Sequence, residues 1–319
     1  MKLMKTTRPI LLIANQFHIP TIEQLDADYE TVHLWQLNHD DKLAVLAKLD
    51  GQCHAAASAS WATDPLIYTL DSLQLIACFG VGVDGIDFRQ TQKNGIRVSN
   101  TPGVLDDAVA EIALGLMLSC ARKLVSADAF LRAGKWHNGP LPLGSGLAGK
   151  TVGIAGMGRI GLEVAQRCEA FKMKVIYHNR NPREVDYRYC SSLEELAGEC
   201  DMLVNVLPGG PATTGILSEE IFRALGPRGL FINVGRGQSV DEPALIRALE
   251  TGAIAGAGLD VYAREPNVPE ELAALDNVVL LPHIGSATQE TRRAMGDLVR
   301  NNLKAFYEDG SLLSEYLPS

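Results

Sequence analysis

The sequence predicts an α/β protein built from two doubly wound parallel sheets. Two series of short β-rich runs alternate with helical patterns, and such alternation is typical of parallel sheets covered by helices on both faces. A glycine-rich turn opens the second series. A chain of 319 residues, 46% hydrophobic and 21% charged, accommodates two domains of roughly 100 to 200 residues each.

The first series occupies the N-terminal third. Its expected strands are 10–14, 31–35, 54–57, 73–79 and 96–99, separated by helical patterns at 21–29, 41–49, 64–70 and 87–93. The apolar run 10–14 follows several lysines, but it is too short for a signal-peptide core or a membrane span. We therefore expect it to be a first buried strand.

A long helix is predicted at 104–125, between the two series. Its acidic residues come early and its basic residues late, as the helix dipole favours, and it is apolar on nearly every side from Ala108 to Leu118. A helix of this kind is covered all round. The pattern favours a homodimer interface, with a central helix of one large core as the alternative.

The second series predicts six strands, at 151–155, 174–177, 202–207, 230–234, 256–261 and 278–281. Six strands suit a complete dinucleotide-binding unit. A last helix is expected at 287–307, with Ser286 as its cap and Gln289 three residues on, a capping-box pattern.

The glycine pattern Gly156-x-Gly158-x-x-Gly161 lies directly after the first strand of this series and opens a helix. The first glycine allows a tight turn, the second lets the backbone approach a pyrophosphate, and the third lets helix and strand pack closely. The amides at the helix N-terminus then meet the diphosphate. This context predicts dinucleotide binding, with a merely structural turn as the alternative.

The second strand of this series ends in His178-Asn179-Arg180, where such units usually carry an Asp or Glu that binds the adenosine ribose. A carboxylate would repel a 2′-phosphate, whereas a guanidinium binds it through charge-assisted hydrogen bonds. The missing acid predicts NADP(H) in preference to NAD(H). The alternative is a solvated turn after a strand.

Ionisable residues follow three later strands: Arg236, then Asp260 and Glu265, then His283. Ligands bind at the carboxyl ends of such strands. Hydride transfer between nicotinamide and a 2-oxo acid needs a cation for the carboxylate or carbonyl and a proton donor for the oxygen. Arg236 and His283 supply those types. Each has a simpler alternative: a surface ion pair for Arg236, a helix-flanking acid for Glu265 and a hydrogen-bonded core histidine for His283.

Composition excludes several classes. The net charge of −9 and the pI near 5.3 argue against affinity for nucleic acid or an anionic membrane. The six cysteines include no C-x-x-C pair and no ligand-like partnership with histidines, so neither a disulfide framework nor a metal site is indicated. Reduced thiols fit a cytoplasmic protein.

Six ordered motifs resemble the D-isomer-specific 2-hydroxyacid dehydrogenase family. They are FGVGVDGID (79–87), NTPGVLDDAVAE (100–111), GMGRIG (156–161), NVGRGQSVDEPAL (233–245), LDVYAREP (259–266) and PHIGSAT (282–288). The resemblance covers nearly the whole chain. It implies a flavodoxin-like substrate domain at 1–100, an inserted Rossmann cofactor domain at 101–284, and a C-terminal helix at 285–319 that returns to the first domain. Hinges are expected near 100–102 and 282–285.

The resemblance also implies roles for individual residues. His283 is the expected general acid/base, Glu265 its partner favouring the protonated form, and Arg236 the residue that orients and polarises the 2-oxo acid. The amides of Val81 and Gly82 are expected to help hold the substrate carboxylate. The expected cofactor-binding residues are Gly156, Gly158, Arg159, Ile160, Gly161, Asn179, Arg180, Leu207, Pro208, Thr213, Val234, Gly235, Asp260 and Gly285.

Within the family, the resemblance is to NADP-dependent glyoxylate/hydroxypyruvate reductases and to hydroxyphenylpyruvate reductases. The expected reaction is the reduction of a small 2-oxo acid to a D-2-hydroxy acid. The alternatives are a bulkier substrate, of hydroxyphenylpyruvate or 2-ketogluconate type, or a non-catalytic, corepressor-like module that binds dinucleotide. Trp61 either packs at the rim of the substrate site or lines its mouth.

Overall fold

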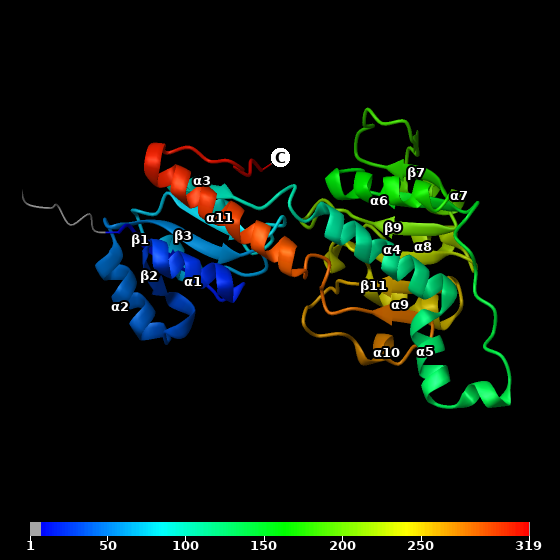
Figure 1. The fold of residues 1–319 in the computed structure, drawn as a ribbon. Helices are drawn as coiled ribbons and strands as arrows, with labels where there is room; N and C mark the ends of the chain where they lie inside the picture. Colours follow the sequence, from blue (N-terminus) through cyan, green and yellow to red (C-terminus); the bar gives the residue numbers. More distant parts are fainter. Residues whose placement is uncertain (1–7, 319) are drawn as a thin grey trace, which may run out of the picture. The chain divides into compact units, whose positions relative to one another are not determined.

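The computed structural model describes residues 8–318, which fold into two compact units (Figure 1). The first unit runs to Leu105 and resumes at Thr288, and the second unit comprises Asp106–Ala287. The lysines that precede the first strand, within residues 1–7, lie outside the described residues.

The first unit contains one parallel sheet of five strands in the order β2-β1-β3-β4-β5. The strands are β1 (Ile10–Ile13), β2 (Glu30–His33), β3 (Cys53–Ala59), β4 (Leu75–Phe79) and β5 (Arg97–Ser99). The helices are α1 (Ile19–Asp28), α2 (His39–Leu49), α3 (Phe88–Asn94) and α11 (Gln289–Asp309), with 3-10 turns η1 (Leu34–Gln36) and η2 (Pro65–Thr69). This strand order is that of flavodoxin-like folds.

The second unit contains a parallel sheet of seven strands in the order β12-β11-β10-β9-β6-β7-β8. The strands are β6 (Thr151–Ala155), β7 (Lys174–His178), β8 (Arg188–Tyr189), β9 (Met202–Asn205), β10 (Leu230–Asn233), β11 (Gly256–Leu259) and β12 (Val278–Leu280). The order from β8 to β11 is that of the Rossmann fold, which reverses between β6 and β9, where dinucleotides bind. The predicted fold class, two doubly wound parallel sheets, is confirmed.

Helices cover the second sheet on both faces (Figure 1). They are α4 (Asp106–Arg122), α6 (Arg159–Ala170), α7 (Leu193–Glu199), α8 (Glu219–Leu225), α9 (Glu242–Glu250) and α10 (Glu270–Ala273), with the 3-10 turn η4 (Gly237–Ser239). α5 (Leu124–Arg132) packs instead on α4 and on the 3-10 turn η3 (Lys135–Asn138). One face of α4 packs on β10, β11 and β12, and α4 also packs on α6. Much of this apolar helix is therefore buried within its own unit.

Local structure differs from prediction in four places. The segment predicted as a helix at 64–70 is a 3-10 turn, and the two-residue strand β8 was not predicted. The long helix ends at Arg122 because Lys123 takes a left-handed φ of 53°, after which α5 begins. The predicted Ser286 cap is wrong: Thr288 caps α11, since its side chain accepts a hydrogen bond from the Thr291 amide.

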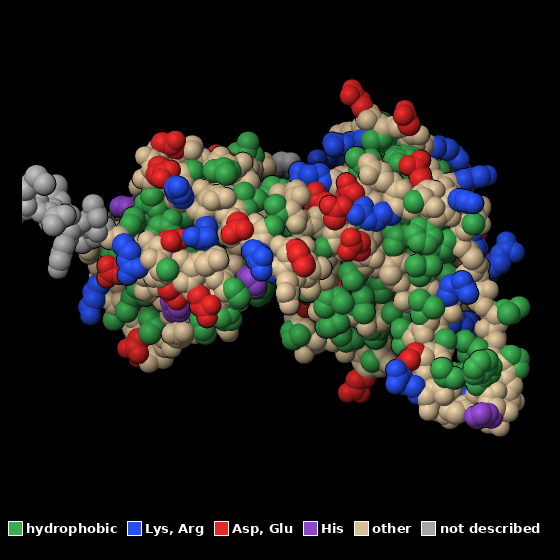
Figure 2. Space-filling view, in the orientation of Figure 1, with side chains coloured by type: hydrophobic (Ala, Val, Ile, Leu, Met, Phe, Trp, Pro, Cys, Tyr) green, Lys and Arg blue, Asp and Glu red, His purple; other side chains and the backbone are tan. Residues whose placement is uncertain are grey.

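The segment that follows α4 carries exposed apolar side chains, and α5 has no buried residue. The exposed large side chains here are Leu124, Val125, Leu131, Trp136 and Leu143. Trp136 in η3 is 68% exposed. Figure 2 shows hydrophobic side chains gathered over α5, at the lower right of the view. We call residues 124–143 the arm.

Candidate active site

The glycine loop joins β6 to α6. Gly156 has a φ of 106°, a conformation that L side chains rarely adopt, and Gly158 caps α6 with open space where a side chain would be. Within residues 8–318, the amides of Arg159, Ile160 and Gly161 donate no hydrogen bond. Free amides at a helix N-terminus beside an open approach fit an anionic diphosphate.

The third glycine brings the helix against the strand end. A Cβ at Gly161 would lie 2.2 Å from the Gly156 carbonyl oxygen, which is too close for any side chain. A Cβ at Gly156 would in turn lie 3.0 Å from the Val206 backbone, just after β9. The loop is therefore closely packed at the point where the strand order reverses.

Arg159 begins α6 and lies beside Asp106, the first residue of α4. Its Nε is 3.5 Å from an Asp106 carboxylate oxygen, and the arginine side chain is 62% exposed. Burial raises the pKa of Asp106, while the charge of Arg159 acts in the opposite direction. Arg159 thus lies at the mouth of the loop in a partly exposed ion pair, and ion pairs of this kind contribute little to stability.

The end of β7 is tied to the glycine loop. The Asn179 side-chain oxygen accepts a hydrogen bond from the Met157 amide at 2.5 Å, and Tyr189 donates to the Asn179 carbonyl. The next residue, Arg180, is exposed and forms no ion pair within the described part of the chain. Asn179 therefore positions the turn, and Arg180 is the side chain that extends from it.

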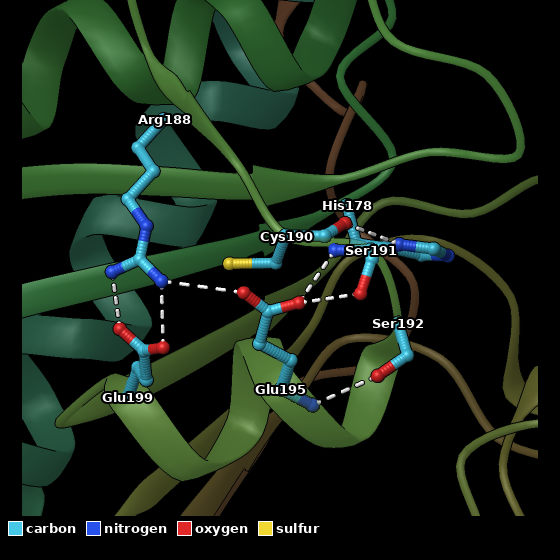
Figure 3. A network of polar contacts seen from close by, with 7 residues as sticks. All are labelled: His178, Arg188, Cys190, Ser191, Ser192, Glu195 and Glu199. Carbon is cyan, nitrogen blue, oxygen red and sulfur yellow. Dashed lines mark hydrogen bonds and ion pairs between the residues drawn. The ribbon is translucent and has the colours of Figure 1, made fainter.

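Arg188, in β8, is committed to other partners (Figure 3). Its guanidinium pairs with Glu199 through both terminal nitrogens and lies 3.2 Å from Glu195. Glu195 also accepts hydrogen bonds from the Ser191 amide and hydroxyl, and the hydrogen bond with Arg188 lowers the pKa of Glu199. This network fastens β8 to α7 and leaves the Arg188 charge neutralised.

Glu265 and His283 form the central contact of the site. His283 follows β12 and Glu265 follows β11, and the His283 Nδ1 lies 2.6 Å from a Glu265 carboxylate oxygen. The other carboxylate oxygen accepts a hydrogen bond from the Tyr262 amide at 3.0 Å. With Glu265 on Nδ1, the Nε2 edge of a 46% exposed imidazole is available to a ligand.

The electrostatics of this pair favour an ionised carboxylate. Partial burial raises the pKa of Glu265, but the hydrogen bond and charge of His283, the Tyr262 amide and the charge of Arg236 together hold it below its ordinary value. An ionised carboxylate therefore lies within hydrogen-bonding distance of the imidazole. The arrangement can store a proton and deliver it.

Asp260 organises the turn that carries His283. Its two carboxylate oxygens accept hydrogen bonds from the amides of Ile284 and Gly285, at 2.7 and 2.8 Å, and its carbonyl accepts one from the His283 amide. The residue is 2% exposed, and burial raises the pKa of Asp260 against the opposing effect of the two amides. These bonds support the left-handed φ of 53° at His283.

Three buried polar side chains of the site were not predicted from the sequence. Asn205 ends β9 and Asn233 ends β10, and the Asn205 amide donates to Asn233 at 2.8 Å and to Ser239 at 2.7 Å. Ser239 in turn donates to the Arg236 carbonyl at 2.6 Å. The available signal was an asparagine at the end of two otherwise apolar strands, MLVN and LFIN.

This network fixes two loops that carry expected ligand-binding residues. The side-chain oxygens of Asn205 and Asn233 accept hydrogen bonds from the amides of Leu207 and Gly235, each at 3.1 Å. A Cβ at Gly237 would overlap the Tyr262 backbone at 1.9 Å, so the Arg236 loop lies directly against the segment that leads to Glu265. Arg236 is therefore positioned beside the histidine–glutamate pair.

The other expected cofactor residues lie at the same edge of the sheet. Val234 follows β10 and is buried, and its amide donates to the Asn205 carbonyl. In the loop after β9, the Thr213 hydroxyl donates to the Pro208 carbonyl at 2.7 Å. The expected residues of the second unit thus follow the carboxyl ends of β6, β7, β9, β10, β11 and β12, at one edge of the sheet.

Val81 and Gly82 belong to the first unit, in the loop after β4. Within residues 8–318 their amides donate no hydrogen bond, while the Val81 carbonyl accepts one from Asn100. A Cβ at Gly85 would lie 2.4 Å from the Ala62 amide, so this loop packs tightly on the segment after β3. Trp61 in that segment is exposed.

No group of three or more His, Cys, Asp or Glu side chains within residues 8–318 is arranged to hold a metal ion. In the same part of the chain no helix combines the length and apolar character that crossing a bilayer requires.

Comparison with known proteins identifies the family. Residues 114–285 match the model of the D-isomer specific 2-hydroxyacid dehydrogenase NAD binding domain. The chain belongs to the D-isomer specific 2-hydroxyacid dehydrogenase family. The family predicted from the sequence motifs is confirmed, and with it the class, an NAD(P)-dependent oxidoreductase.

Relatives of this family member carry several names. A hydroxyphenylpyruvate reductase of Plectranthus scutellarioides is 44% identical over 92% of this chain and 94% of its own. A glyoxylate/hydroxypyruvate reductase of Arabidopsis thaliana is 45% identical over 83% of each chain. Among solved structures, the NADPH-dependent glyoxylate/hydroxypyruvate reductase of Sinorhizobium meliloti, in complex with NADP and malonate, is 41% identical, with a TM-score of 0.89 over 97% of both chains.

Proposed function

We propose that this dehydrogenase catalyses the NADPH-dependent reduction of small 2-oxo acids, glyoxylate and hydroxypyruvate first, to D-2-hydroxy acids. The observation that carries the proposal is the hydrogen bond of 2.6 Å between His283 and Glu265, beside Arg236. A purely binding module has no need of a paired proton donor. The reductases named among the relatives support the substrate class.

The residues divide the reaction between them. NADPH, when bound, supplies a hydride to C2 of the oxo acid. His283 donates its proton to the carbonyl oxygen, Arg236 orients the substrate and polarises that carbonyl, and Glu265 stabilises the imidazolium before transfer. One hydride and one proton convert the carbonyl to a hydroxyl, and a proton from solvent restores His283.

The glycine loop and its neighbours are assigned to the cofactor. Gly156, Gly158 and the free amides from Arg159 to Gly161 hold the diphosphate, and Asp260 meets the nicotinamide carboxamide with its remaining acceptor capacity. The lining of the remaining cofactor site is completed by Leu207, Pro208, Thr213, Val234, Gly235 and Gly285. In the first unit, assigned as the substrate domain at residues 1–100, the amides of Val81 and Gly82 hold the substrate carboxylate.

Arg180 is assigned to the 2′-phosphate of NADPH. It extends from the turn after β7 with no competing carboxylate within the described residues, whereas Arg188 is neutralised by two glutamates. The Asn179 side chain already accepts a hydrogen bond from the Met157 amide, so it fixes the shape of the turn. Because it is not an acid, it also does not repel the 2′-phosphate.

Steady-state turnover of a 2-oxo acid panel with NADPH tests the function. Glyoxylate and hydroxypyruvate are expected to give the highest kcat/KM, and background rates on every member would refute catalysis. Hydroxyphenylpyruvate belongs in the panel because a relative of 44% identity carries that name. A preference for it would select the bulkier substrate as the physiological class.

The chain is also proposed to form a homodimer, and cytoplasmic residence remains part of the proposal. Because α4 is largely covered by its own unit, the apolar arm at 124–143 supplies the better surface. We expect light scattering at micromolar concentration to report a dimer, and the double substitution Leu131→Glu with Trp136→Glu to give a monomer. A monomeric wild type would contradict this.

A further inference from the structure

An aromatic and cationic cluster lies in the first unit around Phe79, the last residue of β4. The ring of Phe79 is buried and stacks on Phe17 and His18, with centroid separations of 5.2 and 5.8 Å. The guanidinium carbon of Arg292, in the first turn of α11, lies 5.8 Å from the centroid of the same ring. Three separate segments therefore place this arginine at the carboxyl edge of the five-stranded sheet.

The charge of Arg292 has no counterion in the described chain. No Asp or Glu side chain within residues 8–318 forms an ion pair with it, and burial lowers its pKa. Two turns further along the same helix, Arg300 binds Asp28 through two nitrogens, at 3.0 and 2.8 Å. A partly buried cation without a partner is costly unless a ligand supplies an acceptor.

His18 adds a polar group but no second charge. Burial, followed by the charge of Arg292, lowers the pKa of His18, so its imidazole is neutral near pH 7. Its Nδ1 is engaged with the Thr21 hydroxyl at 2.8 Å. The cluster thus presents one guanidinium, held by an aromatic ring, beside a neutral imidazole.

The cluster is adjacent to the loop assigned to the substrate carboxylate. Phe79 is followed directly by Gly80 and then by Val81 and Gly82, whose amides have no acceptor in the described chain. Two backbone amides can donate one hydrogen bond to each oxygen of a substrate carboxylate. The guanidinium of Arg292 is therefore an additional donor at the same edge of the sheet. With the carboxylate bound by the amides, the part of the substrate left for Arg292 to bind is the group beyond the carbonyl carbon.

We propose that Arg292 is a specificity residue that binds the substituent on C3 of the 2-oxo acid, and that it selects a hydroxyl or carboxylate there over a methyl group. This inference rests on the proposed function. A guanidinium left facing a methyl group loses its hydrogen bonds with water and gains none, whereas a hydroxyl or carboxylate replaces them. Hydroxypyruvate and longer 2-oxo dicarboxylates are then the favoured classes.

The test compares hydroxypyruvate with 2-oxobutyrate, which has a methyl group in place of the hydroxyl. Arg292→Met keeps much of the apolar contact with Phe79 and removes the donors. We expect the ratio of kcat/KM for hydroxypyruvate over 2-oxobutyrate to fall about 10- to 100-fold, with most of the change in KM. Arg292→Lys, which keeps the charge, is expected to restore part of the ratio.

Arg293→Met is the matched control, since Arg293 is the exposed neighbour on the same helix turn. Its substrate ratio is expected to equal that of the wild type. An unchanged ratio in Arg292→Met, or an equal fall for hydroxypyruvate, 2-oxobutyrate and glyoxylate, would overturn the proposal, the latter by placing Arg292 on the common carboxylate or in the fold. A wild type inactive on all three refutes the proposed function itself.

Discussion

The buried side chains behind the Arg236 and His283 loops of the second unit and the backbone amides after β4 in the first unit differ in how far they are already hydrogen-bonded. In the second unit, Asn205, Asn233, Ser239 and Asp260 are buried and hydrogen-bonded, and they fix the loops that carry Arg236 and His283. In the first unit, the amides of Val81 and Gly82 donate to nothing within residues 8–318. Groups that perform chemistry need fixed geometry, whereas groups that recognise a substrate must keep their donors available.

The largest expected effect tests whether the chemistry belongs to the second unit. His283→Asn should lower kcat by about 100-fold or more, because proton transfer contributes that order, while NADPH affinity is retained. Asparagine is preferred to alanine here since it tolerates the left-handed backbone of residue 283. The measurements are single-turnover rates and NADPH titration by fluorescence. Near-normal turnover would remove His283 from the mechanism.

The next effect concerns the cofactor. Arg180→Ala should reduce the NADPH over NADH ratio of kcat/KM by about 10- to 100-fold, because a charge-assisted contact is worth roughly 1.5 to 3 kcal/mol. NADH kinetics should change little. Arg188→Ala is the control, since Arg188 is neutralised by Glu195 and Glu199, and it should leave the ratio unchanged. A wild-type ratio that favours NADH would show that the turn after β7 binds no phosphate.

A smaller change is expected at the partner of the acid. Because the pKa of Glu265 is held below its ordinary value, this residue stays ionised at neutral pH, and the carboxylate favours the imidazolium that reduction requires. Glu265→Gln removes that anion, so the pH profile for reduction should move toward acid, with about 10-fold lower kcat at pH 7. The measurement is the dependence of kcat on pH between pH 5 and 9. An unmoved profile would show that Glu265 and His283 are not coupled.

The smallest expected effect concerns the buried hydrogen-bond network that holds the Arg236 loop in place. Ser239→Ala leaves one buried Asn205 N–H without its acceptor and removes the shortest of the hydrogen bonds to the Arg236 carbonyl, which should lower the free energy of unfolding by about 1 to 3 kcal/mol and raise the substrate KM. Ser218→Ala, which removes a more exposed hydroxyl bonded to Glu220, should change stability by less than about 0.5 kcal/mol. Equal losses in the two variants would argue against a special role for the buried network.

The fold was predictable because its signals are periodic. Buried strands such as LIACF and TVGIA stand out as apolar runs, and the glycine loop lies in the expected strand–helix context. Edge strand β8 has two residues, too few for any pattern. The helix break at Lys123 was also undetectable, since no glycine, proline or asparagine marks it.

The site was predictable residue by residue but not as a network. Charged residues that follow strands could be selected from the sequence, and the structure places Arg236, Glu265 and His283 together, but their roles remain a proposal. The supporting asparagines were not, because an asparagine at a strand end is usually interpreted as a turn residue. Arg292, whose role is proposed above, could not be selected from the sequence for another reason. A helix rich in arginine gives no sign of which arginine lacks a counterion, and only the contacts of Arg300 and Arg292 distinguish them.

The discontinuity of the first unit has a consequence for synthesis on the ribosome. Its strands are made first, yet α11, which packs on β4 and α1, emerges only after all of Asp106–Ala287. Met295, Val299 and Leu303, which α11 buries, reach that sheet last. The first unit therefore cannot complete its fold until the second unit has been synthesised. Until α11 emerges, the face of β4 that it covers is exposed and requires protection from aggregation.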